Sequence, residues 1–199
     1  MKYKFNASKM LCLCMVFGFL CACDSRNIEN ADPDKALFVA AYEGREQDVE
    51  RILSSGEVRN IDVKFSGCTA LHFAVQHGNI RIVRMLIAHG ANMHSKCDAS
   101  AHTPLNTAAY YGRYEIAKEL VKNGADTDGP SSAFGFTPLI TALNKRHTDI
   151  AKLFVESGAD ACAVRANNRN ALESAEAYNQ PEFVTWYMAN NFPRCSTHP

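Results

Sequence analysis

The chain has 199 residues, of which 47% are hydrophobic, and its 21 Lys and Arg residues balance 21 Asp and Glu residues. This length and apolar content fit one folded domain of modest size. The zero net charge argues against a nucleic-acid-binding protein, because such proteins concentrate Lys and Arg against the phosphates.

The first 22 residues have the pattern of an export signal peptide. Lys2, Lys4 and Lys9 form a positive head, and residues 10–20 form an apolar run of 11 residues, which is too short to span a bilayer as a helix. Residues 20–23, with the sequence LCAC, resemble the bacterial lipobox, in which a lipid is attached to the last cysteine. The resemblance implies a lipoprotein signal over 1–22 and lipidation of Cys23. An ordinary cleaved signal, which would release a soluble periplasmic protein, stays the alternative.

The segment after the signal bears on the location of the protein. Residues 23–33 are mostly polar and end in a proline, which predicts a lipid-anchored tether that holds the folded part in the periplasm. In enterobacterial lipoproteins an aspartate after the lipidated cysteine tends to retain the protein at the inner membrane. Asp24 therefore slightly favours the inner membrane, and the outer membrane stays open.

The rest of the chain repeats itself every 34 residues. Two series of glycines keep this interval: Gly44, Gly78 and Gly112, and Gly56, Gly90, Gly124 and Gly158. The segments TALH, TPLN and TPLI begin 34 residues apart, at Thr69, Thr103 and Thr137, and a weaker copy, NALE, begins at Asn170. A fixed period of 20–50 residues indicates a repeat array. These segments resemble the T-P-L-H signature of ankyrin repeats.

Each repeat is predicted to contain two short helices. In the second repeat Thr69 can cap a helix that ends at Gly78, and residues 80–89 carry apolar side chains at helical spacing before Gly90. Glycine accepts the left-handed conformation that often follows a helix C-terminus, which explains why one glycine closes each helix. Helices this short must stack on neighbouring repeats to bury their apolar faces.

The resemblance implies a mostly α fold, an ankyrin-repeat solenoid of about five helix-turn-helix units joined by β-hairpin-like fingers. The ankyrin domain is predicted over residues 34–193, followed by a tail over 194–199. Its units are expected at 34–66, 67–100, 101–134, 135–167 and 168–193, the outer two being degenerate. Two turns are expected to be distorted, because Arg146 replaces a glycine that ends a helix and Ala101 replaces a finger glycine.

The sequence contains no recognisable catalytic or cofactor motif: no G-x-G-x-x-G, P-loop, H-E-x-x-H or paired C-x-x-C. We therefore expect no enzyme activity, no cofactor and no metal. His89, His94, Cys97 and His102 lack the spacing of zinc ligands and are interpreted as loop residues. The histidine of the T-P-L-H signature orders its turn by hydrogen bonds in ankyrin proteins, so the resemblance implies a structural role for His72.

Four cysteines remain once the signal and Cys23 are set aside: Cys68, Cys97, Cys162 and Cys195. In an oxidising compartment they can form disulfides. We favour the pairs Cys68–Cys97 and Cys162–Cys195, because the other pairings must cross more of the stack. The alternative, that all four cysteines are reduced, stays open. Stacked layers lie about 10 Å apart, whereas a disulfide needs α-carbons within about 7 Å.

Ankyrin proteins usually bind partners through the concave surface formed by the finger tips and the ends of the first helices. Carried onto this sequence, the resemblance implies protein-binding residues at Tyr42, Phe65, Gln76, His77, Tyr110, Tyr111, Phe134, Phe136 and Lys145. This set is rich in aromatic residues, which dominate interface energetics. Some of the rings are expected to pack between fingers instead. Tyr110 and Tyr111, in the central repeat, are the strongest candidates.

The resulting hypothesis is a non-catalytic protein-binding module displayed in the bacterial cell envelope. By analogy with membrane-anchored binders that protect bacteria, one specific role is immunity against a secreted toxic enzyme such as a phospholipase. A second role, known for periplasmic ankyrin proteins, is help in peroxide defence. An enzyme with an unrecognised site is the third alternative. The partner itself is not named by the sequence, because repeat scaffolds vary the binding face while keeping the frame.

Overall fold

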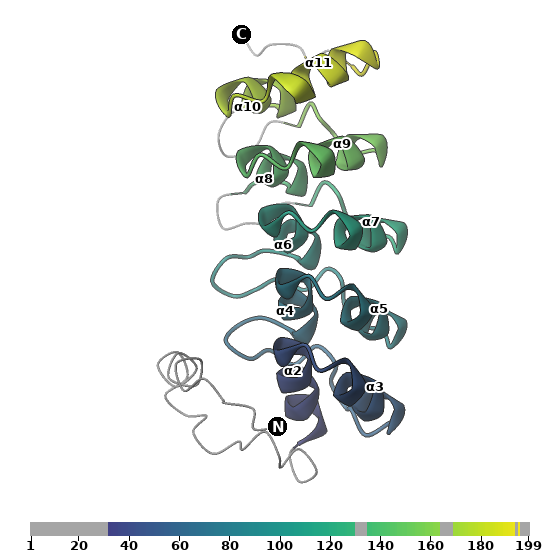
Figure 1. The fold of residues 1–199 in the computed structure, drawn as a ribbon. Helices are drawn as coiled ribbons and strands as arrows, with labels where there is room; N and C mark the ends of the chain where they lie inside the picture. The colour runs from purple at the N-terminus through teal and green to yellow at the C-terminus, as the bar shows by residue number, and fades with distance from the viewer. Residues whose placement is uncertain (1–31, 130–134, 164–168, 194, 196–199) are drawn as a thin grey trace, which may run out of the picture. The chain divides into compact units, whose positions relative to one another are not determined.

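The computed structural model describes residues 32–129, 135–163, 169–193 and 195. Most of the predicted signal and tether, with Cys23 and Asp24, lie outside the described residues, and so do Phe134 and most of the tail. Residues 33–199 belong to one compact unit, and the ten helices of its described part form two columns (Figure 1). Within the described ranges no helix is both long and apolar enough to cross a bilayer.

Each repeat contributes one helix to each column. The first helices are α2 (Pro33–Glu43), α4 (Ala70–His77), α6 (Pro104–Tyr111), α8 (Pro138–Asn144) and α10 (Ala171–Ala177). The second helices are α3 (Glu46–Ser54), α5 (Ile80–Ala88), α7 (Tyr114–Lys122), α9 (Thr148–Glu156) and α11 (Pro181–Ala189). Each helix packs against its counterparts in the neighbouring repeats and against its partner in the same repeat. The structure therefore confirms the predicted solenoid of five helix pairs.

The first helices begin at short polar caps. The side-chain oxygens of Thr103 and Thr137 accept hydrogen bonds from the backbone N–H groups three residues later, at 3.2 and 3.3 Å, and a proline follows each threonine. In the degenerate fifth repeat Asn170 and Glu173 form a reciprocal capping box, with distances of 3.0 and 2.9 Å. The last repeat thus keeps the cap with different residues.

A column of alanines lets the first helices approach closely. One fully buried alanine occupies the same position in every first helix: Ala40, Ala74, Ala108, Ala142 and Ala175. Larger buried residues, among them Leu71, Leu105 and Leu139, fill the space beside this column. Because each of these buried side chains is covered by a neighbouring repeat, the hydrophobic core is continuous along the stack rather than confined to one repeat.

The two turns that were expected to be distorted keep the geometry of the other repeats. Arg146 and Ala101 adopt φ values of 65° and 53°, in the left-handed region that glycine occupies at the equivalent positions. This conformation costs an L-residue about 1 kcal/mol or more. Arg146 compensates with a hydrogen bond of 3.3 Å from its guanidinium to the carbonyl of Asn179, and the amide of Ala101 donates to the carbonyl of Cys97 at 2.8 Å. The prediction of distortion was wrong because the surrounding contacts hold these turns.

The finger of the second repeat is a hairpin turn, and the described residues contain no regular strand. Phe65 and Cys68 exchange two backbone hydrogen bonds, of 3.0 and 3.2 Å, around Ser66 and Gly67. Both central residues have positive φ, 51° and 78°, as a type I′ turn requires. The next finger folds back onto this one, because the amide of Asp98 donates to the carbonyl of Gly67 at 2.9 Å.

The C-terminal end of the stack has its own cover. Phe183 and Tyr187 of α11 are buried, and the Tyr187 hydroxyl donates to the carbonyl of Pro193 at 2.9 Å. The Cys162 and Cys195 sulfurs are bonded, with α-carbons 5.1 Å apart, so Cys195 is tied to the loop after α9. A terminal repeat has no neighbour on its outer side, and these contacts take that neighbour's place.

Gly112 offers a test of the contact between repeats. Both Gly112 and Gly124 end helices with positive φ, 68° and 87°. A β-carbon at position 112 would lie 2.5 Å from Cε1 of His147 in the next repeat, whereas position 124 is open. We expect Gly124→Ala to destabilise the protein by about 1 kcal/mol through backbone strain, and Gly112→Ala to destabilise it more. Urea unfolding followed by circular dichroism measures both, and equal losses would show that the His147 ring moves aside freely.

Candidate protein-binding face

The ends of the first helices and the fingers share one side of the stack. The segments that lead into α4 and α6 extend from the first-helix column on the side away from the second helices (Figure 1). All the described residues of the predicted binding set belong to these helix ends and fingers. They divide into residues that pack between repeats and residues that are exposed.

The predicted residues of the first two repeats form a packed aromatic cluster. The Phe65 ring lies 4.7 Å from Phe38, and the Tyr42 ring lies 5.2 Å from Phe73 and 5.3 Å from His77. Phe65 and Tyr42 are half-buried. These two rings stabilise the contact between the first and second repeats, which leaves His77 as the exposed member of the group.

Gln76 contributes its backbone rather than its side chain to the structure. Its carbonyl accepts two hydrogen bonds from the Arg113 guanidinium in the next repeat, at 2.8 and 3.2 Å. Arg113 was not among the predicted residues. No local signal marks it, because its partner lies 37 residues away in the sequence.

The central repeat carries an exposed pair of tyrosines. Tyr110 and Tyr111 have exposed fractions of 38% and 42%, and their ring centroids are 5.0 Å apart. The Tyr110 ring lies 5.7 Å from the ring of His102 in the finger, and the Lys145 ammonium lies 4.0 Å from its centroid. This is cation–π geometry. We call His102, Tyr110, Tyr111 and Lys145 the tyrosine face.

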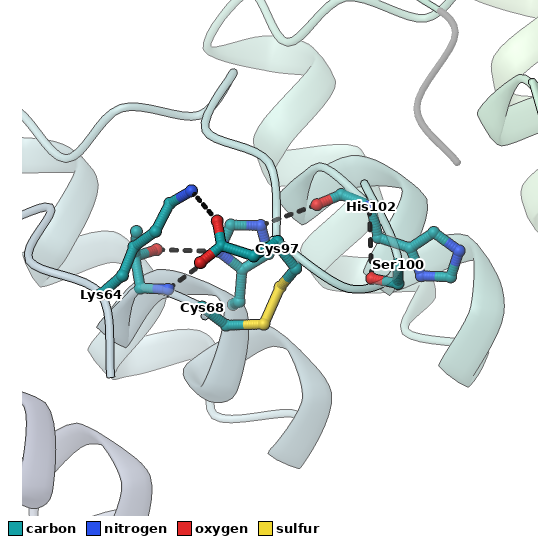
Figure 2. Close-up of polar contacts among 8 residues, drawn as sticks. Lys64, Cys68, Cys97, Ser100 and His102 are labelled. Carbon is teal, nitrogen blue, oxygen red and sulfur yellow. Dashed lines mark hydrogen bonds and ion pairs between the residues drawn. A yellow bond between two sulfur atoms is a disulfide. The ribbon is translucent and has the colours of Figure 1, made fainter. Parts of the chain in front are cut away.

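The finger that carries His102 is fixed to its neighbour by several bonds. Cys68 and Cys97 form a disulfide with α-carbons 4.5 Å apart, and Lys64 pairs with Asp98 at 2.5 Å (Figure 2). The structure thus joins both cysteine pairs that the sequence favoured. The fingers approach more closely than stacked layers because the second finger folds back onto the first.

His72 connects the helix cap to the finger. Its Nε2 lies 3.0 Å from the carbonyl oxygen of His102, and its Nδ1 lies 2.8 Å from the Thr69 hydroxyl. A carbonyl can only accept, so Nε2 carries the proton and Nδ1 accepts from Thr69. Burial lowers the pKa of His72 to about 4, and the hydrogen bond to the His102 backbone opposes that effect. The ring is therefore neutral at pH 7. Burial and the nearby Lys145 also lower the pKa of His102.

The remaining predicted residue, Phe136, is half-buried next to Thr137. Among the described residues no group of three His, Cys, Asp or Glu is placed to hold a metal. Two of the four residues that were considered as zinc ligands have other bonds: Cys97 is in a disulfide, and His89 Nδ1 lies 2.8 Å from the carbonyl of Met85.

The second helices present a different surface. Ion pairs connect neighbouring second helices at 2.6–3.0 Å: Arg81 with Glu46, Arg84 with Glu119, and Lys152 with Glu182. Exposed pairs of this kind contribute little stability, but they join charged side chains of neighbouring repeats across this side. The tyrosine face is therefore the better candidate for a binding surface.

Helix pairs stacked in one direction, with fingers and an aromatic face on one side, define a helical repeat protein of the binding type. The chain matches the sequence profile of a family described as "Ankyrin repeats (3 copies)" over residues 6–97, 37–130 and 108–192. It belongs to the ankyrin repeat family, whose repeats form a protein–protein interaction module.

One curated relative matches part of the chain. Over 64 residues the chain is 39% identical to "Ankyrin repeat domain-containing protein 49" of Bos taurus. The match covers 32% of this chain and 27% of the relative, so the chain spans about a quarter of that protein's length. The similarity concerns the repeats.

The buried His72 predicts a pH dependence of stability. Its pKa is about 4 in the folded chain and about 6.5 in an unfolded one, so the unfolded state takes up a proton first as the pH falls. The contribution of the neutral His72 ring to the free energy of unfolding is full above pH 6.5. It falls by about 2–3 kcal/mol as the pH is lowered from 6.5 to 4. We expect the stability difference between wild type and His72→Gln to shrink over this range in urea unfolding. A pH-independent difference would contradict a neutral buried ring.

Proposed function

We propose that this protein is anchored in the bacterial cell envelope and binds one protein partner through the tyrosine face. The observation that carries the proposal is the exposure of Tyr110 and Tyr111 in the central repeat. Exposed tyrosines supply large contact area at a small entropic cost and are enriched at binding hot spots. Contacts with His102 and Lys145 restrain the Tyr110 ring, so less of its motion is lost on binding.

The periplasmic location rests on the sequence and on the cysteines. The LCAC motif supports a lipid on Cys23, which would hold the mature chain on a membrane through several acyl chains. The two disulfides of the repeat domain suit an oxidising compartment, since cytosolic thiols are kept reduced. A polar tether would then hold the ankyrin domain in the periplasm, at the inner membrane if Asp24 acts as it does in enterobacterial lipoproteins.

Immunity is the specific role that we propose for this binder. A membrane-anchored protein meets enzymes that other cells deliver into the periplasm, and a stack of repeats can block an enzyme by covering its active site. Such a role needs no catalytic residue in the binder, only a rigid face and a fixed location. A secreted phospholipase is the kind of target proposed, by analogy with known protective lipoproteins.

The anchor can be tested by Cys23→Ala. We expect the wild-type chain to sediment with the membrane fraction and to incorporate radiolabelled palmitate, because the lipid is attached at Cys23. The variant should lose the radiolabel, and it should either retain its signal peptide or become soluble. Cys21→Ala is the matched control and should keep the label. A membrane-bound, labelled Cys23→Ala chain would contradict the anchor.

The binding face can be tested by Tyr110→Ala with Tyr111→Ala. The full chain, tagged after Pro199 and expressed in its native cell, is used to capture envelope proteins. We expect one partner to be captured by the wild type and to be at least tenfold depleted with the double variant, because two interface anchors are removed. Met188→Ala is the matched control, since Met188 is a comparably exposed side chain, at 40%, in α11.

The captured partner then decides the role. For immunity, the partner is an enzyme whose activity the wild-type chain abolishes and the double variant does not. Equal capture by both forms would contradict the proposed face. A strain that lacks the protein and loses peroxide survival, without one tight partner, would favour the peroxide-defence role instead.

A further inference from the structure

We infer that the tyrosine face recognises an acidic protein surface, one that presents carboxylates around an apolar anchor. The inference rests on the proposed function and adds the chemistry of the partner. Its basis is the distribution of charge over the three central repeats. The first helices and the turns that follow them, residues 70–79, 104–113 and 138–147, contain no Asp and no Glu. The same segments contain Arg113, Lys145 and Arg146.

The chain as a whole is neutral, so its acidic residues lie elsewhere. The second helices carry many of them, including Glu46, Glu119 and Glu182, which pair with Arg and Lys side chains of adjacent repeats. The acid in the finger beside the tyrosine face is also neutralised, because Asp98 pairs with Lys64 at 2.5 Å. Neutrality of the chain therefore coexists with a positive central face.

In the described residues no carboxylate pairs with the cations of these three segments. Arg113 and Arg146 donate to backbone carbonyls, of Gln76 and Asn179, rather than to carboxylates. The exposed Lys145 places its ammonium over the Tyr110 ring, and an ammonium has three N–H donors, of which a ring face engages only part. A partner carboxylate can bind the remaining donors of Lys145 while an apolar side chain packs on Tyr111.

This combination fits an acidic protein better than a nucleic acid. Arg113 lies in the third repeat, and Lys145 and Arg146 lie in the fourth. Three cations in two repeats are few for a phosphate backbone, which is bound by dense cationic clusters. A positive face around aromatic anchors instead gives electrostatic complementarity to an acidic protein patch, which speeds association and selects against basic partners.

Defined peptides test the inference. Random 12-residue peptides displayed on phage are selected on the full chain, purified in mild detergent, and in parallel on the variant with Tyr110→Ala and Tyr111→Ala. We expect the wild type alone to enrich peptides with an excess of Asp and Glu around a large apolar residue. One enriched acidic peptide, labelled with fluorescein, then serves as the probe for affinity measurements by anisotropy.

A charge series at Lys145 separates electrostatics from packing. We expect Lys145→Gln to weaken binding of the probe about threefold and Lys145→Glu tenfold or more, because the charge is first removed and then reversed. Raising the salt from 50 to 300 mM should weaken binding of the probe to the wild type. It should also reduce the difference in affinity between the wild type and the two Lys145 variants. Lys118→Glu is the matched control, since Lys118 is exposed on the second helix α7 and away from the face.

Each contrary outcome overturns a different statement. If Gln and Glu at position 145 weaken binding equally, Lys145 acts by packing on Tyr110 and the acidic partner is wrong. The acidic partner is also wrong if the peptides whose enrichment depends on the tyrosines are neutral or basic. It is wrong as well if a 20-nucleotide single strand binds the face more tightly than every enriched peptide. In these cases the tyrosine face remains the binding face. If both proteins enrich the same peptides, or none, the proposed face itself fails.

Discussion

None of the helices in this stack can bury its apolar face alone, and the rest of the structure follows from that constraint. The described helices have seven to eleven residues, so each depends on its neighbours for cover. The alanine column meets this need by letting the first helices pack closely. Since the ends of the stack must be capped and its interior is filled, the long sides are left for binding. The second-helix side is occupied by ion pairs between repeats, which leaves the first-helix side.

Aromatic rings gather towards both ends of the stack, with different roles. At the C-terminal end, where a neighbour is missing, the rings of Phe183, Trp186, Tyr187 and Phe192 form a group that is closed by the Cys162–Cys195 disulfide. The N-terminal group, Phe38, Tyr42, Phe65 and Phe73, packs instead between the first and second repeats. In the third repeat Tyr110 and Tyr111 stay exposed and can face a partner.

The bonds around the finger of His102 prepare this face before any partner arrives. The Cys68–Cys97 disulfide, the Lys64–Asp98 pair and the contact of His72 with the His102 carbonyl restrain it from three directions. A restrained face loses less conformational entropy on binding. His72, the histidine of the repeat signature, thus has a structural role that also restrains the binding face. Its ring is neutral because it is buried.

The sequence by itself determined the repeat, its helices and caps, because these depend on local patterns that recur every 34 residues. It also favoured the two cysteine pairs. It ranked Tyr110 above Tyr42 only by its place in the central repeat, since both tyrosines stand two residues before a helix-ending glycine. The tertiary structure decided this difference through the neighbour: Phe73 of the next repeat packs on Tyr42, whereas the equivalent residue beside Tyr110 is the smaller Thr141. A residue 31 positions away therefore sets whether the ring is covered or exposed, and no local pattern contains that information.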